Sequence, residues 1–255
     1  MLRFFRNIRQ RLLTDNKFSK YLLYAIGEIV LVVIGILIAI SIDNWNQERI
    51  LKREEQVALQ NLKQDFQYNR EALQMNITIT QKTIESNLQV LNYTGSKPKP
   101  DTEEAFNVLI NDVTVTSEFF PKNSFLDDLM NSGRLQIIRS AGLREKLSSW
   151  KPAFEHIKEE ERQTKSYSDP LLNFIIKNGS WLNADEVATT QAIAKYNFPK
   201  SGFEVDNRNL LGYLEFENMI ENLVIYHERV LSSQKKGLQL IEEILDLINK
   251  EIKDE

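Results

Sequence analysis

The sequence predicts an all-α protein in which an N-terminal transmembrane helix continues into a long helix that pairs antiparallel with a long C-terminal helix, with smaller helices between them. Three observations predict this fold: an apolar run over residues 21–42, apolar residues spaced by three and four over 43–93, and the same spacing over 207–253. Only nine Gly and six Pro occur in 255 residues, of which 42% are hydrophobic, as in folded helical proteins.

Residues 21–42 carry a single charge, Glu28. At ~1.5 Å per residue this run spans roughly 33 Å as a helix, which matches a hydrocarbon core of about 30 Å. Tyr21 lies at one end of the run and Trp45 just beyond the other, where aromatic anchors meet the headgroups. We therefore expect residues 21–42 to be a transmembrane helix, with the lipid bilayer as a partner.

The segment before this run, residues 1–20, is basic and amphipathic, so we expect it to lie on an anionic membrane surface. Its surface-binding arginines are Arg3, Arg6, Arg9 and Arg11. Six Lys and Arg precede the run and three follow it closely (Arg49, Lys52, Arg53), which predicts a cytoplasmic N-terminus. Residues 43–255 then form a periplasmic helical domain on a bacterial inner membrane. The alternative, a signal peptide, is disfavoured because the apolar run is long and contains a glutamate.

One face of the predicted span carries features of helix association. The face contains Tyr24, Glu28, Leu31, Gly35 and Ala39. The pair Gly35 and Ala39, four residues apart, lets another helix approach closely. A carboxyl group in a membrane is costly, so Glu28 either bonds across such an interface, carries protons, or extends to the cytoplasmic headgroups.

The first half of the predicted domain begins with a helix over 43–93 whose apolar stripe includes two polar residues, Asn69 and Thr80. Polar residues at such positions can set helix register or partner number. Residues 95–101 predict a loop, and Thr102 caps a short helix that ends at 113. Residues 114–120, TVTSEFF, favour a strand but have no second strand to pair with, so we expect an extended loop or a helix end there.

The second half is predicted as short helices followed by a long one. Ser124 caps a helix that stops at Gly133, and Ser140 caps another that continues past Pro152 with a kink. A further helix is expected from Asp169 and Pro170 to Gly179. One more is expected over Asp185–Lys195, within an otherwise loop-rich 180–205, before the long helix of 207–253.

Few residues suggest chemistry. His156 and His227 each lie on a predicted amphipathic helix without the partner spacing of a metal motif, so we expect surface or half-buried histidines. Glu159–Glu161 predicts a solvated face, and Asp127 with Asp128 lies at a helix start, where the dipole favours acids. The chain has no cysteine, and we find no nucleophile elbow, P-loop or dinucleotide fingerprint. We therefore expect no enzyme, no cofactor and no metal.

The charge balance bears on partners. Residues 43–255 hold 26 basic and 34 acidic residues, which gives this part a net charge of −8. A nucleic acid partner requires a basic face, so we expect none.

Two stretches resemble a widespread family of uncharacterised single-pass bacterial membrane proteins with a GEIVLVVIGILIA-type signature. The first is residues 4–46. The second is a central pattern formed by Pro121, Phe125, Asp128, Leu129, Ser132, Gly133 and Leu135, with Leu143, Arg144 and Leu147 after it. The resemblance covers nearly the whole chain and implies an inner-membrane location with an outward helical domain. It implies no activity and no site residues.

Three functions remain open at this stage. The first is a non-catalytic membrane-anchored scaffold, as a homo-oligomer or as an accessory subunit of a membrane-protein complex. The second is an ion-coupled energiser or stator-like subunit that uses Glu28. The third is a periplasmic ligand-sensing module that signals through a partner, which a cavity lined by Arg134, Arg139 or Trp150 would favour and a solid apolar core would not. The sequence does not identify a small ligand.

Overall fold

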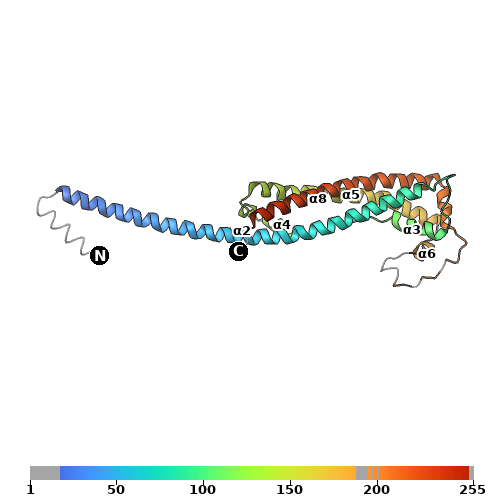
Figure 1. Cartoon of the computed structure of the whole chain (residues 1–255), viewed down its shortest axis with the longest axis horizontal. Coiled ribbons are helices and arrows are strands. Elements are labelled where there is room, and N and C mark those ends of the chain that lie inside the picture. Colours follow the sequence, from blue (N-terminus) through green and yellow to red (C-terminus); the bar gives the residue numbers. More distant parts are fainter. Residues whose placement is uncertain (1–17, 188–194, 197, 200, 253–255) are drawn as a thin grey trace. The chain divides into compact units, whose positions relative to one another are not determined.

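The computed structural model describes residues 18–187, 195, 196, 198, 199 and 201–252, and these residues form helices and loops without a strand (Figure 1). The α-helices are α2 (Phe18–Leu91), α3 (Glu103–Val113), α4 (Ser124–Asn131), α5 (Ala141–Asn178), α6 (Trp181–Asp185) and α8 (Leu214–Glu251). Two 3-10 helices complete the fold, η1 (Arg134–Ile137) and η2 (Asn207–Gly212). The all-helical prediction is confirmed. The chain divides into two compact units, residues 1–56 and 57–255.

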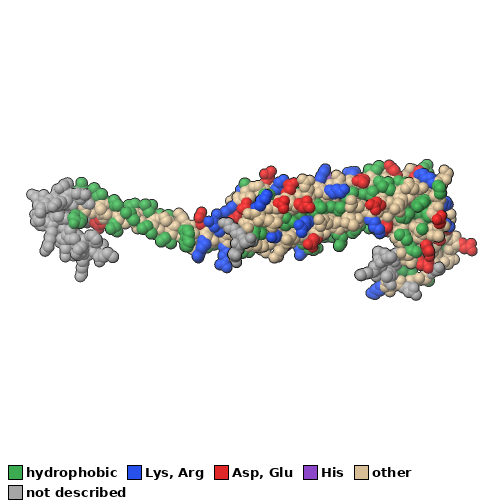
Figure 2. Space-filling view, in the orientation of Figure 1, with side chains coloured by type: hydrophobic (Ala, Val, Ile, Leu, Met, Phe, Trp, Pro, Cys, Tyr) green, Lys and Arg blue, Asp and Glu red, His purple; other side chains and the backbone are tan. Residues whose placement is uncertain are grey.

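In the first unit the described residues belong to α2, and their side chains are largely exposed. The most apolar 18-residue window in this helix has a mean hydropathy of 2.8, and none of it is buried. By length and composition the helix could cross a membrane. Figure 2 shows its surface as mostly hydrophobic.

In the second unit, α2 from Val57 onward lies beside α5 and α8, and α8 runs antiparallel to α2 (Figure 1). The smaller helices lie between α2 and α8 in the sequence, as predicted. This long pairing buries two separate apolar clusters. The first, here the Trp150 cluster, contains Phe66, Leu73, Phe119, Trp150, Ile157, Ile241 and their neighbours. The second, the Phe216 cluster, contains Val90, Phe106, Ile110, Leu171, Ile175, Phe216, Ile220 and their neighbours.

One predicted boundary within α5 differs from the structure. Asp169 and Pro170 do not open a new helix, because α5 runs through Pro152 and Pro170 to Asn178 before Gly179. An interior proline costs a helix about 3 kcal/mol. We attribute the continuity to burial on both sides of Pro170, since Ile157 and Ile175 are fully inaccessible to solvent.

The capping residues also differ from prediction. Thr102 caps α3 as expected, accepting from the Ala105 amide at 3.1 Å. The N-cap of α4 is Asn123, not Ser124, and its side chain does not cap the helix. Its Oδ1 instead accepts from the indole Nε1 of Trp150 at 2.8 Å, so this side chain serves the core. Ser140 is the N-cap of α5 but makes no side-chain capping bond.

Three further expectations concern loops and helix ends. Residues 115–120 form a loop after Thr114, the C-cap of α3 with a helical backbone, so no strand forms there. The helix expected over Asp185–Lys195 is wrong at its start, because α6 ends at Asp185, and residues 188–194 lie outside the described part of the chain. The long C-terminal helix begins at Leu214, since the residues from Asn207 form η2 first.

Candidate functional site

A belt of buried polar side chains separates the two apolar clusters of the second unit. It is formed by neighbouring stretches of α2, α5 and α8. Its buried members are Thr80, Thr83, Ser86 and Asn87 from α2; Glu160, Glu161, Thr164 and Ser168 from α5; and His227, Ser233 and Gln234 from α8. Along α5 these residues lie between Ile157 of the Trp150 cluster and Leu171 of the Phe216 cluster, whereas Ile84 on α2 and Leu231 on α8, both of the Trp150 cluster, lie among them. Buried polar groups are costly unless they are bonded, so their partners define what the belt does.

The loop of residues 114–123, here named the extended segment because it belongs to no helix or strand, supplies many of these partners. Ser117 meets two side chains: its hydroxyl lies 2.9 Å from that of Thr80 and accepts from Gln234 Nε2 at 3.0 Å. Thr80 lies 3.1 Å from Gln234 Oε1, which closes a triangle of three buried groups on three elements. The segment is therefore held by side chains of the long helices rather than by a second strand.

Asn69 holds the far end of this segment. Its side-chain amide donates to the carbonyl oxygen of Lys122 at 3.0 Å, and its Oδ1 accepts from the Lys122 amide at 2.7 Å. Asn69 is fully buried. The two bonds have the donor and acceptor pattern of a β-ladder pair. Asn69 therefore positions the segment against α2, as Thr80 does through Ser117, and both are polar residues of the predicted stripe.

Glu160 and Glu161 are buried, so the prediction of a solvated face over Glu159–Glu161 is wrong for two of its three residues. Arg229 of α8 forms an ion pair with Glu160. The Arg229 Nε atom lies 3.0 Å from Glu160 Oε2, and Arg229 Nη2 donates to Glu160 Oε1 at 3.0 Å. Glu161 Oε1 accepts from the backbone amide of Phe119 at 3.0 Å, and Lys158 Nζ lies 3.4 Å from Oε2. Burial raises the pKa of Glu161 to about 7, against the weaker opposing effect of Lys158.

His227 is buried rather than exposed or half-buried, contrary to expectation. Its Nδ1 lies 2.8 Å from the carbonyl oxygen of Leu223, and its Nε2 lies 3.3 Å from that of Val115. The shorter distance favours a neutral ring that donates from Nδ1. Burial lowers the pKa of His227, and the two carbonyl contacts oppose this only in part. His156 is exposed, as expected.

A pocket of about 440 Å³ opens beside the belt, between the extended segment and α5. Its lining is rich in charge of both signs. The lining residues are Thr116, Ser117, Glu118, Glu155, Lys158, Glu159, Glu161, Arg162 and Lys165. The bidentate pair of Arg162 with Glu159 (2.7 and 2.9 Å) holds the Glu159 carboxylate, and that bond lowers the Glu159 pKa to about 2.

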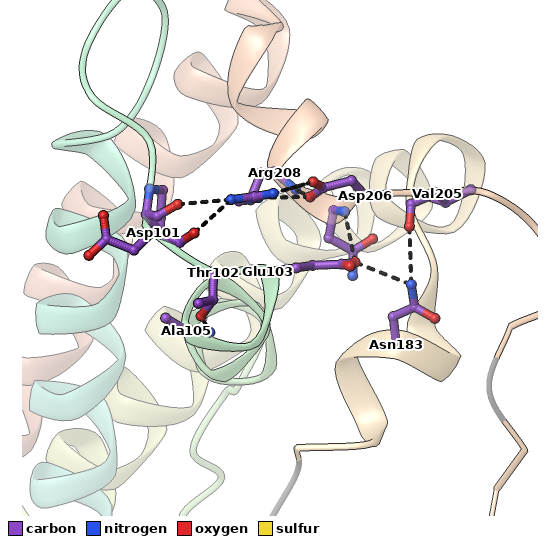
Figure 3. Close-up of polar contacts among 10 residues, drawn as sticks. Asp101, Thr102, Glu103, Ala105, Asn183, Val205, Asp206 and Arg208 are labelled. Carbon is purple, nitrogen blue, oxygen red and sulfur yellow. Dashed lines mark hydrogen bonds and ion pairs between the residues drawn. The ribbon is translucent and has the colours of Figure 1, made fainter.

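A second polar cluster lies near η2 and α3 (Figure 3). Arg208 binds Asp206 and donates to the carbonyl oxygens of Pro100 and Asp101. Glu103 Oε1 accepts from Asn183 and from the backbone of Asn207. Since its charged groups bond one another and the backbone, this cluster joins three segments of the fold and is structural.

The predicted membrane residues lie along one helix, α2. Glu28, Leu31, Gly35 and Ala39 are exposed, as is Tyr24. A Cβ at Gly35 would meet no atom within 4 Å, so this face is open. Trp45 is also exposed, with the Arg49 guanidinium 5.5 Å from its ring centre. The Tyr21 side chain and the arginines at 3, 6, 9 and 11 lie outside the description.

Two of the residues named for the sensor hypothesis, Trp150 and Arg134, have described contacts. Trp150 packs against Phe66, Phe119 and Phe154 in a solid aromatic group. Arg134 pairs with Asp128 on the surface. Among the described residues, no group of three His, Asp or Glu side chains is arranged to hold a metal ion.

The belt residues follow the three-and-four spacing of the buried apolar residues, although several of them are charged or polar. In α5 the residues 157, 161, 164, 168, 171 and 175 step by four and three, and all of them are buried. Glu161, Thr164 and Ser168 therefore occupy core positions of the same stripe as Ile157 and Leu171. In α8 the residues 227, 230, 234, 237 and 241 do the same. Tracing the stripe through its polar members would have found the belt.

A protein-family model matches part of the chain. Residues 28–152, just under half of the chain, match the model described as "Family of unknown function (DUF6090)". This match supports a relation to an uncharacterised domain family. Neither the curated proteins nor the solved structures that were compared with the chain gave a match.

Proposed function

We propose that this protein is a non-catalytic, membrane-anchored interaction protein, an oligomeric or accessory subunit of a bacterial inner-membrane complex. In this proposal α2 crosses the membrane with its N-terminus in the cytoplasm, and the second unit is periplasmic and binds a protein partner. The observation that carries the proposal is the apolar window of α2, none of which is buried. Water-exposed apolar surface of this extent marks a membrane or protein contact.

The proposed association face supports assembly through the span. Gly35 and Ala39 leave this face open, and Glu28 lies on the same side. A carboxyl group is costly in an apolar surrounding unless it is bonded, and association through this face would place Glu28 at the interface.

Single-cysteine crosslinking tests this proposal cleanly because the natural chain contains no cysteine. In native membranes, Gly35→Cys and Ala39→Cys are expected to form disulfide-linked dimers or adducts with a partner under mild oxidation. Val33→Cys and Leu37→Cys are the matched controls, since each lies about half a turn from Gly35. Equal crosslinking at all four positions, or none at any, contradicts the association face. A chain that is extracted from membranes by salt or alkali alone contradicts the anchor.

Two alternatives each have one supporting observation. The carboxyl of Glu28 within the apolar window supports an ion-coupled subunit. Glu28→Gln separates this alternative from the scaffold: unchanged complexes with loss of a proton-dependent activity favour ion coupling. The charged pocket beside the belt supports a ligand-sensing module, and its ligand class can be argued from the structure.

A further inference from the structure

The pocket between residues 116–118 and α5 has the size of a small-ligand site. Its volume of about 440 Å³ falls within the range of about 300–1,000 Å³ that is typical of ligand pockets. All its lining residues belong to the second unit. The site is therefore independent of the anchoring role proposed above.

The ion pairs in this pocket differ in strength. Arg162 and Glu159 form two short bonds, so neither is available to a ligand at low cost. Lys165 lies 3.8 Å from Glu118, and Lys158 lies 3.4 Å from Glu161. These two distances exceed those of charge-assisted hydrogen bonds, about 2.7–2.9 Å. Lys158 and Lys165 can thus exchange their present neighbours for a better anion.

Glu161 forms the buried wall of the pocket. Only 4% of its side chain is exposed. Oε1 is bonded to the Phe119 amide, whereas Oε2 has only the long ion pair with Lys158 Nζ at 3.4 Å. A buried carboxylate oxygen in this state gains from a donor that carries positive charge and several N–H groups.

The opposite wall is the loop backbone of residues 116–118. In the part of the chain that the structure describes, the peptide groups of Thr116, Ser117 and Glu118 make no hydrogen bond. Such groups can donate to and accept from the amide or carboxylate of a bound molecule. Glu118 and Glu155 add carboxylates to the pocket.

We propose that this pocket binds a small amino-acid zwitterion, either a free amino acid or a dipeptide. The ammonium group bonds Oε2 of Glu161, and the carboxylate bonds Lys165 and Lys158. A purely anionic ligand would meet four carboxylates, and a polyamine would meet three cations, so a molecule with both charges fits the lining best.

The test uses the full-length chain in mild detergent and isothermal titration calorimetry. The probes are L-alanine and L-alanyl-L-alanine, which distinguish the two sources by their affinities. N-acetyl-L-alanyl-L-alanine lacks the ammonium, and L-alanyl-L-alanine amide lacks the carboxylate. One zwitterion is expected to bind saturably, and each analogue at least tenfold more weakly. No saturable binding of either zwitterion, or equal binding of the analogues, overturns the proposal.

Three variants locate the site. Glu161→Gln and Lys165→Met are each expected to weaken binding at least tenfold. Glu243→Gln, on the surface of α8 and paired with Lys146, is the matched control and should bind as the natural chain does. Circular dichroism confirms that each variant is folded. If Glu161→Gln is not folded, Lys165→Met and the analogues still decide, and natural affinity in Lys165→Met overturns the proposal.

Discussion

The Trp150 cluster and the polar belt are built on the same three helices, yet they stabilise the fold in different ways. In the cluster, Trp150 packs edge-on against Phe66 and Phe119, with ring centres 5.6 and 6.2 Å apart. In the belt, Thr80, Ser117 and Gln234 occupy equally buried positions but meet through directional bonds. Apolar packing contributes most of the free energy, and the bonded belt fixes which residues lie opposite one another. Four predictions test this division, from the largest expected effect to the smallest.

The largest effect is expected from Trp150→Ala. The change removes a fully buried ring and leaves the Asn123 Oδ1 atom without its donor, so the free energy of unfolding should fall by about 3–5 kcal/mol. Chemical unfolding followed by circular dichroism in detergent measures the loss. Trp45→Ala, at an exposed ring, is the control and should stay within about 0.5 kcal/mol. Similar losses in the two variants would contradict the packing role.

Arg229→Met tests the belt. It leaves Glu160 buried without its cation, and breaking a buried pair costs about 3–5 kcal/mol. Because Arg229 is 45% exposed, we expect a smaller loss of about 2 kcal/mol. The double variant Arg229→Met with Glu160→Gln should recover most of that loss in the same unfolding assay. Additive losses in the double variant would show that the two groups do not act as a pair.

The third prediction concerns pH. Glu161 has a folded pKa raised from 4.5 to about 7, so the stability it contributes is present below pH 4.5 and lost as pH rises to about 7. His227 has a lowered pKa, so its contribution is present above pH 6.5 and lost as pH falls. Over pH 4.5–6.5 the two slopes oppose each other.

Single variants should uncover these opposed slopes. Glu161→Gln is expected to make stability rise with pH in that window, and His227→Gln to make it fall, each by at most about 1.4 kcal/mol per pH unit. Unfolding midpoints at half-unit intervals from pH 4.5 to 7.5 measure both. Identical pH profiles for the natural chain and both variants would refute the assignment.

The smallest effect is expected at Gly237 of α8, beside the Trp150 cluster. An added Cβ would lie 2.7 Å from Ile157 Cδ1, the end of a flexible side chain that can shift. Overpacking then offsets the helix gain of about 1 kcal/mol, so Gly237→Ala should change stability little or lower it slightly. Gly142→Ala in α5 meets no atom within 4 Å and should gain about 0.5–1 kcal/mol. A clear gain at Gly237 would mean that the cluster is loosely packed.

The sequence predicted the long helices well because their apolar residues recur at three and four without interruption. It predicted a new helix at Pro170 because the free-energy cost of a proline inside a helix can be read from the sequence. The burial of Leu171 and Ile175 against other elements, which offsets that cost, cannot be read from it. Glu161 was missed for a related reason. A run of glutamates among charged neighbours is typical of a solvated helix face. Only the position of Glu161 on the buried stripe indicates that its carboxylate lies inside, where it accepts from the Phe119 amide. The pocket could not be predicted, because it depends on where the extended segment lies against α5.

The extended segment 114–123 also bears on solubility. Peptide groups that make no hydrogen bond within the described residues, as at residues 116–118, can pair with the backbone of another chain and begin to aggregate. This segment carries protection of the kind found on natural sheet edges. Glu118 places a charge outward, and Pro121 cannot donate to an added strand. The unbonded peptide groups can therefore bond a small ligand, while Glu118 and Pro121 oppose pairing with another chain.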